Sequence, residues 1–335
     1  MKKKVNTISS CIIIKNEIDN IPNLLDDLRK FSDEIIVVDT GSTDGTLEYL
    51  KEQTDIILKH FDWIKDFSAA RNFSFSQATK DWIFWCDADD RIPDDLIDAI
   101  LKQKSKFNKS KYNAYYIDYL FGPDIIVPRI RLIKRNTNPM WYGRCHEFLW
   151  GDDIKYDDTV FHDKGYIIHQ RDTGNNPFQN SDRNIKIFIH QLLNNPESVS
   201  LRDICYFSNE LRDNGYMDKA YFIAKNVFSD PDLPITEGLM LLFNTCNYIW
   251  LQNEYFCDEA IETILVFINN YENRNELLRK DVYGLLAFYY NTKGNIEAAK
   301  VYAQKAIDTP MHPNKESFSY IEYFGEILPN EILNN

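Results

Sequence analysis

The chain has 335 residues, with 38 basic and 51 acidic side chains and a formal net charge of −13. So acidic a chain is a poor candidate for nucleic-acid binding, which depends on Lys and Arg side chains that neutralise phosphates. With 44% hydrophobic and 27% charged residues, the sequence predicts a folded protein rather than a disordered one. Its length predicts about two domains.

The N-terminal residues predict neither a secretory signal nor a membrane anchor. The apolar run after Lys2, Lys3 and Lys4 ends at Ile14, and no window approaches the ~20 apolar residues that span a bilayer. The cysteines are scattered without a CxxC pair, which favours reduced thiols over disulfides or a zinc site. We therefore expect a soluble, cytoplasmic protein without a transmembrane segment.

Residues 8 to 100 alternate short β-branched runs with amphipathic stretches. This alternation is typical of βαβ units and predicts a mostly parallel sheet. Ligands of such sheets bind beyond the carboxyl ends of the strands, so polar residues there are the first candidates for a site. The expected strands are Ile8–Ile14, Glu34–Asp39, Ile56–His60 and Trp82–Asp87, and the expected helices are Ile18–Phe31, Thr43–Glu52 and Phe67–Thr79.

Beyond Asn108 the pattern changes to aromatic and β-branched runs. Such runs, interrupted by the turn-like pairs Gly122-Pro123 and Gly151-Asp152, predict an antiparallel extension that completes the first domain. Asp172–Pro177 is the expected linker, so we assign residues 1–175 to the first domain and 176–335 to the second. The expected strands of the extension are Tyr112–Leu120, Ile125–Lys134 and Val160–His169.

Strand patterns are absent from Asp182 onward, where the sequence repeats. Ala220, Ala260 and Ala299 lie 40 and 39 residues apart, each in an amphipathic stretch that follows an aromatic-rich one. This period is typical of stacked helical hairpins, and the last copy resembles a tetratricopeptide repeat. The predicted fold class is therefore an α/β domain followed by an all-α domain of helical hairpins, with an ordinary α-helical domain as the alternative.

Asp87-Ala88-Asp89 comes at the end of an apolar strand. Side chains alternate in extended backbone, so Asp87 and Asp89 would point the same way. Two carboxylates placed so repel each other unless a cation lies between them, and oxygen ligands of this kind suit Mg²⁺ or Mn²⁺. The alternative is a solvated acidic turn in which Asp90 caps the next helix.

Asp39 ends a second expected strand, and Gly41 permits a tight turn directly after it. The carboxylate lies where it could bind a ribose or a base edge. The alternative is helix capping, which Ser42 and Asp44 would satisfy without Asp39.

Asp66 and Arg71 open the next helix and could pair locally. A surface ion pair contributes only about 0–1 kcal/mol, so stability alone explains Arg71 poorly. Near the Asp87–Asp89 turn, its guanidinium would help to hold a diphosphate.

Residues 8 to 170 resemble family 2 inverting glycosyltransferases of the GT-A fold, which use nucleotide-sugar donors. The Asp66–Asn72 string, the Tyr142–Glu147 string and the helical tail are similar to those of sublancin-type peptide S-glycosyltransferases. Soluble relatives that build lipopolysaccharide cores share much of this pattern. The strings that carry the resemblance are Ile12-Ile13-Ile14-Lys15-Asn16-Glu17, Val38-Asp39-Thr40-Gly41-Ser42-Thr43-Asp44, Asp66–Asn72 and Asp87-Ala88-Asp89.

The resemblance implies a UDP-sugar donor and a divalent cation, Mn²⁺ or Mg²⁺. It implies Asp87, Asp89 and a late histidine, His169, as metal ligands, and imidazole suits Mn²⁺ better than Mg²⁺. The donor-binding residues that it implies are Asn16 and Glu17 at the floor of the base pocket, Asp39 at the uracil or ribose, Asp44, Asp66 and Arg71 around the nucleotide, and Asp87, Ala88 and Asp89 at the diphosphate and metal.

An inverting transfer needs a base that removes the acceptor proton. The resemblance places Tyr142–Glu147 on the acceptor side, with His146 and Glu147 as candidate catalytic residues. Adjacent residues in extended backbone face opposite ways, so only one of the two should face the sugar. We favour Glu147 as the base and His146 as a substrate or phosphate contact.

The expected reaction is transfer of a hexose or N-acetylhexosamine to a Cys, Ser or Thr of a protein or peptide. Helical-hairpin arrays present concave surfaces that suit polypeptides or a second copy of the chain, so a peptide acceptor and a homodimer through the repeats are both expected. The alternatives are a transferase that builds a lipopolysaccharide core or surface polysaccharide, and a helical binding scaffold with a degenerate transferase domain.

Overall fold

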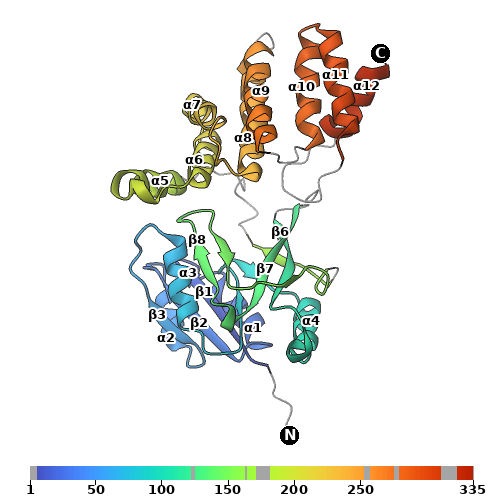
Figure 1. Cartoon of the computed structure of the whole chain (residues 1–335). Coiled ribbons are helices and arrows are strands. Elements are labelled where there is room, and N and C mark those ends of the chain that lie inside the picture. Colours follow the sequence, from blue (N-terminus) through green and yellow to red (C-terminus); the bar gives the residue numbers. More distant parts are fainter. Residues whose placement is uncertain are drawn as a thin grey trace. The chain divides into compact units, whose positions relative to one another are not determined.

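The computed structural model describes residues 6–121, 125–162, 164–170, 182–252, 257–274, 279–310 and 323–334. The chain divides into two compact units, Met1–Gln179 and Asn180–Asn335 (Figure 1). In the described residues the first unit is α/β and the second is all-α. The expected linker Asp172–Pro177 and the expected turn Gly122-Pro123 lie outside the described residues.

The first unit is built on one mixed sheet with the strand order β3-β2-β1-β4-β7-β6-β11-β5. The β3-β2-β1-β4 half is parallel, and β7 joins it antiparallel to β4, which confirms the predicted α/β fold class with an antiparallel extension. The strands are β1 (Ile8–Ile14), β2 (Glu34–Asp39), β3 (Ile57–His60), β4 (Trp82–Trp85), β5 (Asp90–Arg91), β6 (Ala114–Phe121), β7 (Ile125–Lys134), β10 (Tyr156–Asp157, paired with β6) and β11 (Ile167–His169).

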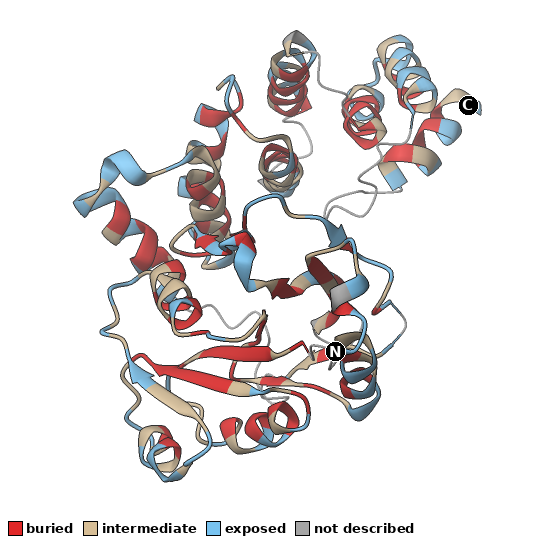
Figure 2. Ribbon diagram, turned by 60° about the horizontal axis from the view of Figure 1, so that its bottom comes forward, coloured by how far each residue is buried: buried red, intermediate tan, exposed pale blue. Residues whose placement is uncertain are grey.

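Two layers cover this sheet, and its strands β1, β2 and β4 are buried almost throughout, which Figure 2 shows in red. On one face, Leu24 of α1 and Leu96 of α4 pack with Ile12 and Phe84. On the other face, α3 packs beside the two-stranded hairpin of β8 and β9, whose Trp141 faces the sheet. These elements are α1 (Ile21–Arg29), α2 (Thr46–Glu52), α3 (Phe67–Ser76), α4 (Asp94–Lys104), the 3₁₀ turns Phe107–Lys109 and Arg135–Thr137, β8 (Met140–Tyr142) and β9 (Phe148–Trp150).

The predicted strand Val160–His169 is wrong over most of its length. Only Ile167–His169 is extended and paired. The reason is the carboxylate of Asp157, which accepts hydrogen bonds from the backbone N–H groups of Thr159 (2.8 Å) and Val160 (3.1 Å) and so turns the chain. A side chain that bonds its own downstream backbone competes with the strand ladder.

The second unit consists of consecutive helical hairpins, α6 with α7, α8 with α9 and α10 with α11. Ala220, Ala260 and Ala299 are buried, one on the second helix of each hairpin, which confirms the predicted repeat. No helix in the described residues is both long and apolar enough to cross a bilayer. The helices are α5 (Arg183–Asn194), a 3₁₀ turn at Pro196–Ser198, α6 (Leu201–Asp213), α7 (Met217–Val227), α8 (Ile235–Gln252), α9 (Cys257–Asn273), α10 (Lys280–Thr292), α11 (Ile296–Asp308), a π-helical turn at Tyr323–Ile327 and α12 (Leu328–Asn334).

Glycines make the turns of the first and last hairpins. Gly215 (φ 83°) and Gly294 (φ 82°) both adopt the left-handed conformation just beyond a helix end. After α10, the N–H of Asn295 donates to the carbonyl of Tyr290 at 2.9 Å, the long-range bond of a Schellman motif. Most residues with a Cβ are strained in this conformation, so these two turns favour glycine.

Candidate active site

The loops that follow β1 and β2 are joined to each other at the carboxyl ends of the strands. The side-chain Oδ1 of Asn16 accepts a hydrogen bond from the N–H of Thr43 at 2.7 Å. The backbone N–H of Asn16, a residue with φ 57°, donates to Ser42 Oγ at 2.9 Å. The N–H of Glu17 donates to Thr46 Oγ1 at 2.8 Å. Asn16 and Glu17 therefore brace two neighbouring loops on the ligand-binding side of the sheet.

Asp39 and Asp44 both act within the second of these loops. The buried carboxylate of Asp39 accepts the N–H groups of Gly41 (3.0 Å) and Ser42 (3.1 Å). Asp44 accepts those of Thr46 (3.0 Å) and of Ile18 in the neighbouring loop (3.2 Å). Both carboxylates thus shape turns, whereas the N-cap of α2 is Gly45 and has no side-chain capping bond.

The half-buried carboxylate of Glu17 lies within electrostatic range of the acidic turn after β4. Burial raises the pKa of Glu17, and the negative charges of Asp44 and Asp87 raise it further, while His169 opposes them. The first and fourth strands therefore direct acidic groups toward one region.

After β4 the chain turns instead of staying extended. The N–H of Asp87 donates to Asp90 Oδ2 at 2.9 Å, and the N–H of Asp90 donates to the carbonyl of Asp87 at 3.1 Å. The expectation that Asp87 and Asp89 share one side of an extended strand is therefore wrong, and the two carboxylates take different partners. Ala88, between them, packs its methyl group into the core.

Asp89, Asp90 and His169 form a group of possible metal ligands, with one ligand atom of each lying within 4.8 Å of the others. Asp90 is fully buried, and its Oδ1, 3.7 Å from His169 Nδ1, has no hydrogen-bond partner in the described part of the chain. Two carboxylates and an imidazole are suitable donors for Mn²⁺ or Mg²⁺. The sequence predicted Asp89 and His169 for this group but assigned Asp87 where the structure has Asp90.

Asp87 and Asp89 have different pKa values because their surroundings differ. Burial raises the pKa of Asp89 to about 7, and the neighbouring Asp87 and Asp90 raise it while His169 lowers it. Burial acts on Asp87 in the same direction, but the positive charges of Arg71 and Arg131 outweigh it and hold the pKa of Asp87 at about 2. A bound cation would favour the ionised form of Asp89, since opposite charge offsets desolvation.

Arg131, on β7, compensates the charge of Asp90, and sequence reasoning missed it. Its fully buried guanidinium places Nη1 3.3 Å from Asp90 Oδ2 and lies 3.8 Å above the ring of Trp85 and 4.6 Å from that of Tyr119. The signal that could have found it is a charged residue inside the apolar run Ile130–Ile133, because an unpaired charge is rarely buried.

The start of α3 and the β8–β9 hairpin hold each other through backbone contacts, so two of the recognised sequence strings form one unit. Asp66 caps α3 by accepting the N–H of Ala69 at 2.9 Å. The cap residue and residues in the first two turns of the helix contact the hairpin. The contacts are Asp66 Oδ2 with Arg144 Nε (3.8 Å), the Phe67 N–H with the Arg144 carbonyl (2.9 Å), the Ser68 hydroxyl with the Gly143 carbonyl, and Asn72 with both the carbonyl (2.9 Å) and the N–H (2.8 Å) of Trp141.

Arg71 joins this unit to the acidic turn. Its Nε donates to Glu147 Oε1 and its Nη2 to Asp87 Oδ1, both at 2.7 Å. The guanidinium lies 5.0 Å from the ring of Trp85 and 4.9 Å from that of Trp141. Arg71 therefore pairs with Asp87 and Glu147 rather than with Asp66, the local partner that the sequence suggested.

The loop that carries His146 and Glu147 is a turn rather than an extended strand. It connects β8 to β9, and Gly143 (φ 88°) and His146 (φ 51°) are both left-handed. The argument that the two side chains face opposite ways therefore does not apply here. Glu147 is directed to Arg71, which gives its carboxylate a defined place beside the acidic turn.

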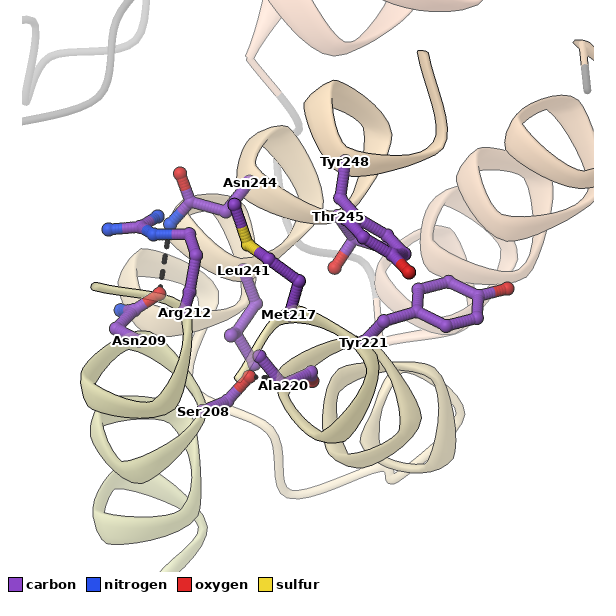
Figure 3. Close-up of a pocket in the computed structure, with 10 residues that line it drawn as sticks. All are labelled: Ser208, Asn209, Arg212, Met217, Ala220, Tyr221, Leu241, Asn244, Thr245 and Tyr248. Carbon is purple, nitrogen blue, oxygen red and sulfur yellow. Dashed lines mark hydrogen bonds between the residues drawn. The ribbon is translucent and has the colours of Figure 1, made fainter. Parts of the chain in front are cut away.

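The second unit contains a small pocket (Figure 3). Its volume of about 20 Å³ accommodates a water molecule, and a sugar or nucleotide would not fit. Asn244 donates to Asn209 across one side of it at 2.9 Å. The pocket is lined by Ser208, Asn209, Arg212, Met217, Ala220, Tyr221, Leu241, Asn244, Thr245 and Tyr248.

The first unit matches one family of known proteins over almost its whole length. The family described as Glycosyl transferase family 2 matches residues 9–178, half of the chain. A TPR repeat-containing protein of Synechococcus elongatus is 36% identical over 149 residues, covering 44% of this chain and 36% of that protein. The SPbeta prophage-derived glycosyltransferase SunS of Bacillus subtilis is 27% identical over 232 residues, covering 63% of this chain and 50% of SunS.

The matched segments thus span half or less of the length of these curated relatives. Among solved structures, S. aureus TarS 1–349 in complex with UDP shares 14% identity at a TM-score of 0.42, with 79% of this chain and 89% of that chain covered. A mannosyltransferase of Pyrobaculum calidifontis in complex with GDP-Man and Mn²⁺ shares 15% identity at a TM-score of 0.39, with 80% and 86% covered.

Proposed function

Because the chain belongs to glycosyl transferase family 2, we propose that it transfers a hexose or N-acetylhexosamine from a UDP-sugar, with inversion, to a Cys, Ser or Thr side chain of a protein or peptide. The observation that carries this proposal is the connection of two groups of residues. The acidic turn Asp87–Asp90 and the loop of Glu147 come from distant parts of the chain, and Arg71 bonds to both.

On the donor side, Asp89, Asp90 and His169 are the residues that would hold Mn²⁺ or Mg²⁺. When bound, the cation supplies positive charge that stabilises the departing diphosphate. The loops at Asn16–Glu17 and Asp39–Asp44, which are hydrogen-bonded to each other, would receive the nucleotide. Asp66 would act indirectly, by starting α3 and pairing with Arg144.

On the acceptor side, Glu147 is the proposed base. Its carboxylate would accept the proton of the acceptor thiol or hydroxyl while the acceptor attacks the anomeric carbon. The pair with Arg71 holds this carboxylate beside the acidic turn. His146, in the same turn, would contact the substrate.

Two observations bear on the alternatives. The outer face of the β8–β9 hairpin exposes Tyr142, Phe148 and Trp150, and such rings suit the faces of sugars, so a glycan acceptor is the second candidate. A degenerate scaffold is disfavoured, because the first unit keeps the charges of Arg71, Asp90 and Arg131 buried, and perturbed ionisable groups cluster at functional sites more often than elsewhere.

The test is a transfer assay with labelled UDP-glucose, UDP-galactose and UDP-N-acetylglucosamine, in the presence of Mn²⁺ or a chelator. Peptides with Cys, Ser or Thr form one set of acceptors and oligosaccharides the other. Mass spectrometry should show a peptide gaining one sugar only with the cation present, with a β-linkage by NMR, and Asp89→Asn should abolish the gain. Transfer to oligosaccharides alone would support the second candidate, and neither transfer nor UDP binding would refute both.

A further inference from the structure

We propose that Arg71 is a positioning residue, which fixes the carboxylate of Glu147 relative to the acidic turn, and that it is not a ligand of the donor diphosphate. This inference rests on the proposed function, because it concerns the base of that reaction. It replaces the role that the sequence suggested for Arg71 with one that the contacts of its side chain define.

The guanidinium of Arg71 is already engaged on several sides. Its Nε and Nη2 donate to Glu147 and Asp87, and the guanidinium lies over the rings of Trp85 and Trp141. Only 9% of the residue is exposed. The Nε and Nη2 donors are held by two carboxylates at 2.7 Å, and giving up either bond to a diphosphate is a poor exchange for a buried charge-assisted bond.

The shape of the guanidinium explains why arginine is needed. Its donors lie in one plane in a fixed fork, so the bond from Nη2 to Asp87 sets the direction in which Nε points at Glu147. The amine of a lysine has rotatable donors on a single atom and would not fix two carboxylates in one orientation. Through this fork, the position of Glu147 is set by the turn that carries Asp89.

Asn72, next to Arg71, also holds the hairpin but does not position the carboxylate of Glu147. A variant of Asn72 can therefore distinguish the two effects. Asn72 makes two hydrogen bonds to the backbone of Trp141, whereas Glu147 is bonded to Arg71. Removing the Asn72 amide should loosen the hairpin while leaving the fork in place. Asn72→Ala is therefore the matched control for variants of Arg71.

The experiment measures transfer kinetics, UDP affinity and near-ultraviolet circular dichroism for full-length R71M, R71K, E147Q, N72A and the double variant R71M/E147Q. R71M should lower kcat about 100-fold, since small misplacement of a reacting group costs about that much. The KM for the UDP-sugar and the affinity for UDP should stay within about twofold, because uniform binding is unchanged. R71K should recover part of kcat, and N72A should lower stability with a much smaller loss of kcat.

The double variant decides whether Arg71 acts through Glu147. If it does, R71M/E147Q should be no slower than E147Q alone, because residues that act as a unit are not additive. Losses that multiply, or a raised KM for the donor with weaker UDP binding, would overturn the inference. If R71M is misfolded by circular dichroism, R71K and R71K/E147Q carry the same comparison. Absence of transfer by the unsubstituted protein would contradict the proposed function instead.

Discussion

At the scale of single residues, the acidic turn shows what local sequence leaves out. The pattern Asp87–Asp90 predicts that carboxylates gather after β4, and they do. Which of them face one another depends on partners far along the chain. His169 lies opposite Asp90 through the antiparallel pairing of β11 with β5, and Arg71 removes Asp87 from the group. Only the fold brings these partners together, so the sequence alone named Asp87 where the structure has Asp90.

This rearrangement predicts an order among the aspartates for metal binding. Asp89→Asn and Asp90→Asn should each weaken Mn²⁺ binding by more than about tenfold, because both remove a ligand oxygen, whereas Asp87→Asn, which touches the group only indirectly, should weaken it less. Calorimetric titration of Mn²⁺ into each variant measures this. A loss for Asp87→Asn as large as that for Asp89→Asn would restore Asp87 as a ligand.

At the scale of elements, the strands of the parallel half were predicted closely. Ile8–Ile14 and Glu34–Asp39 have the predicted bounds, because buried β-branched runs leave little choice of structure. The errors lie where a polar side chain bends the backbone, as Asp157 does before Val160. The contact between α3 and the hairpin was not predicted, since it joins residues 69 to 78 positions apart, and several of its bonds go to backbone groups that any sequence possesses.

In the helical unit, we expect replacement of glycine by alanine to lower the free energy of unfolding by different amounts at two positions. A Cβ at Gly284, inside α10, would collide with the backbone of Phe324, whereas one at Gly294 meets nothing within 4 Å and is disfavoured only by its φ of 82°. Gly294→Ala should therefore cost about 1–2 kcal/mol. Gly284→Ala should cost about 3 kcal/mol or more, because backbone must move.

Urea unfolding followed by far-ultraviolet circular dichroism measures both changes. Gly294→Asn serves as the control, since asparagine tolerates the left-handed conformation, and it should cost less than Gly294→Ala. Equal costs for Gly284→Ala and Gly294→Ala would contradict the close approach of α10 and Phe324.

At the scale of the whole molecule, each unit has its own hydrophobic core, residues such as Ile12 and Trp141 in the first and Phe267 and Leu286 in the second. The two-domain arrangement could be predicted because helical periodicity replaces strand patterns near residue 180. The acceptor could not, since the surface that selects it is set by tertiary packing rather than by a motif.

Separate cores predict that residues 1–179 fold without the helical unit. The fragment should unfold cooperatively in a thermal scan and bind UDP about as tightly as the full chain. If the helical hairpins hold a peptide acceptor, the fragment should no longer transfer sugar to peptides. If they do not hold the acceptor, transfer to oligosaccharides should persist in the fragment. A fragment that aggregates or shows no cooperative transition would mean that the first core depends on the second unit.

The pairing of Arg71 with Glu147 also bears on synthesis, since these residues lie 76 positions apart. At about 5–20 residues per second, the ribosome adds the carboxylate some 4–15 seconds after the guanidinium, and His169 comes later still. The residues that we propose to receive the nucleotide are thus synthesised before those proposed for the transfer step. Products of interrupted translation should therefore be inert, unable to spend donor on water.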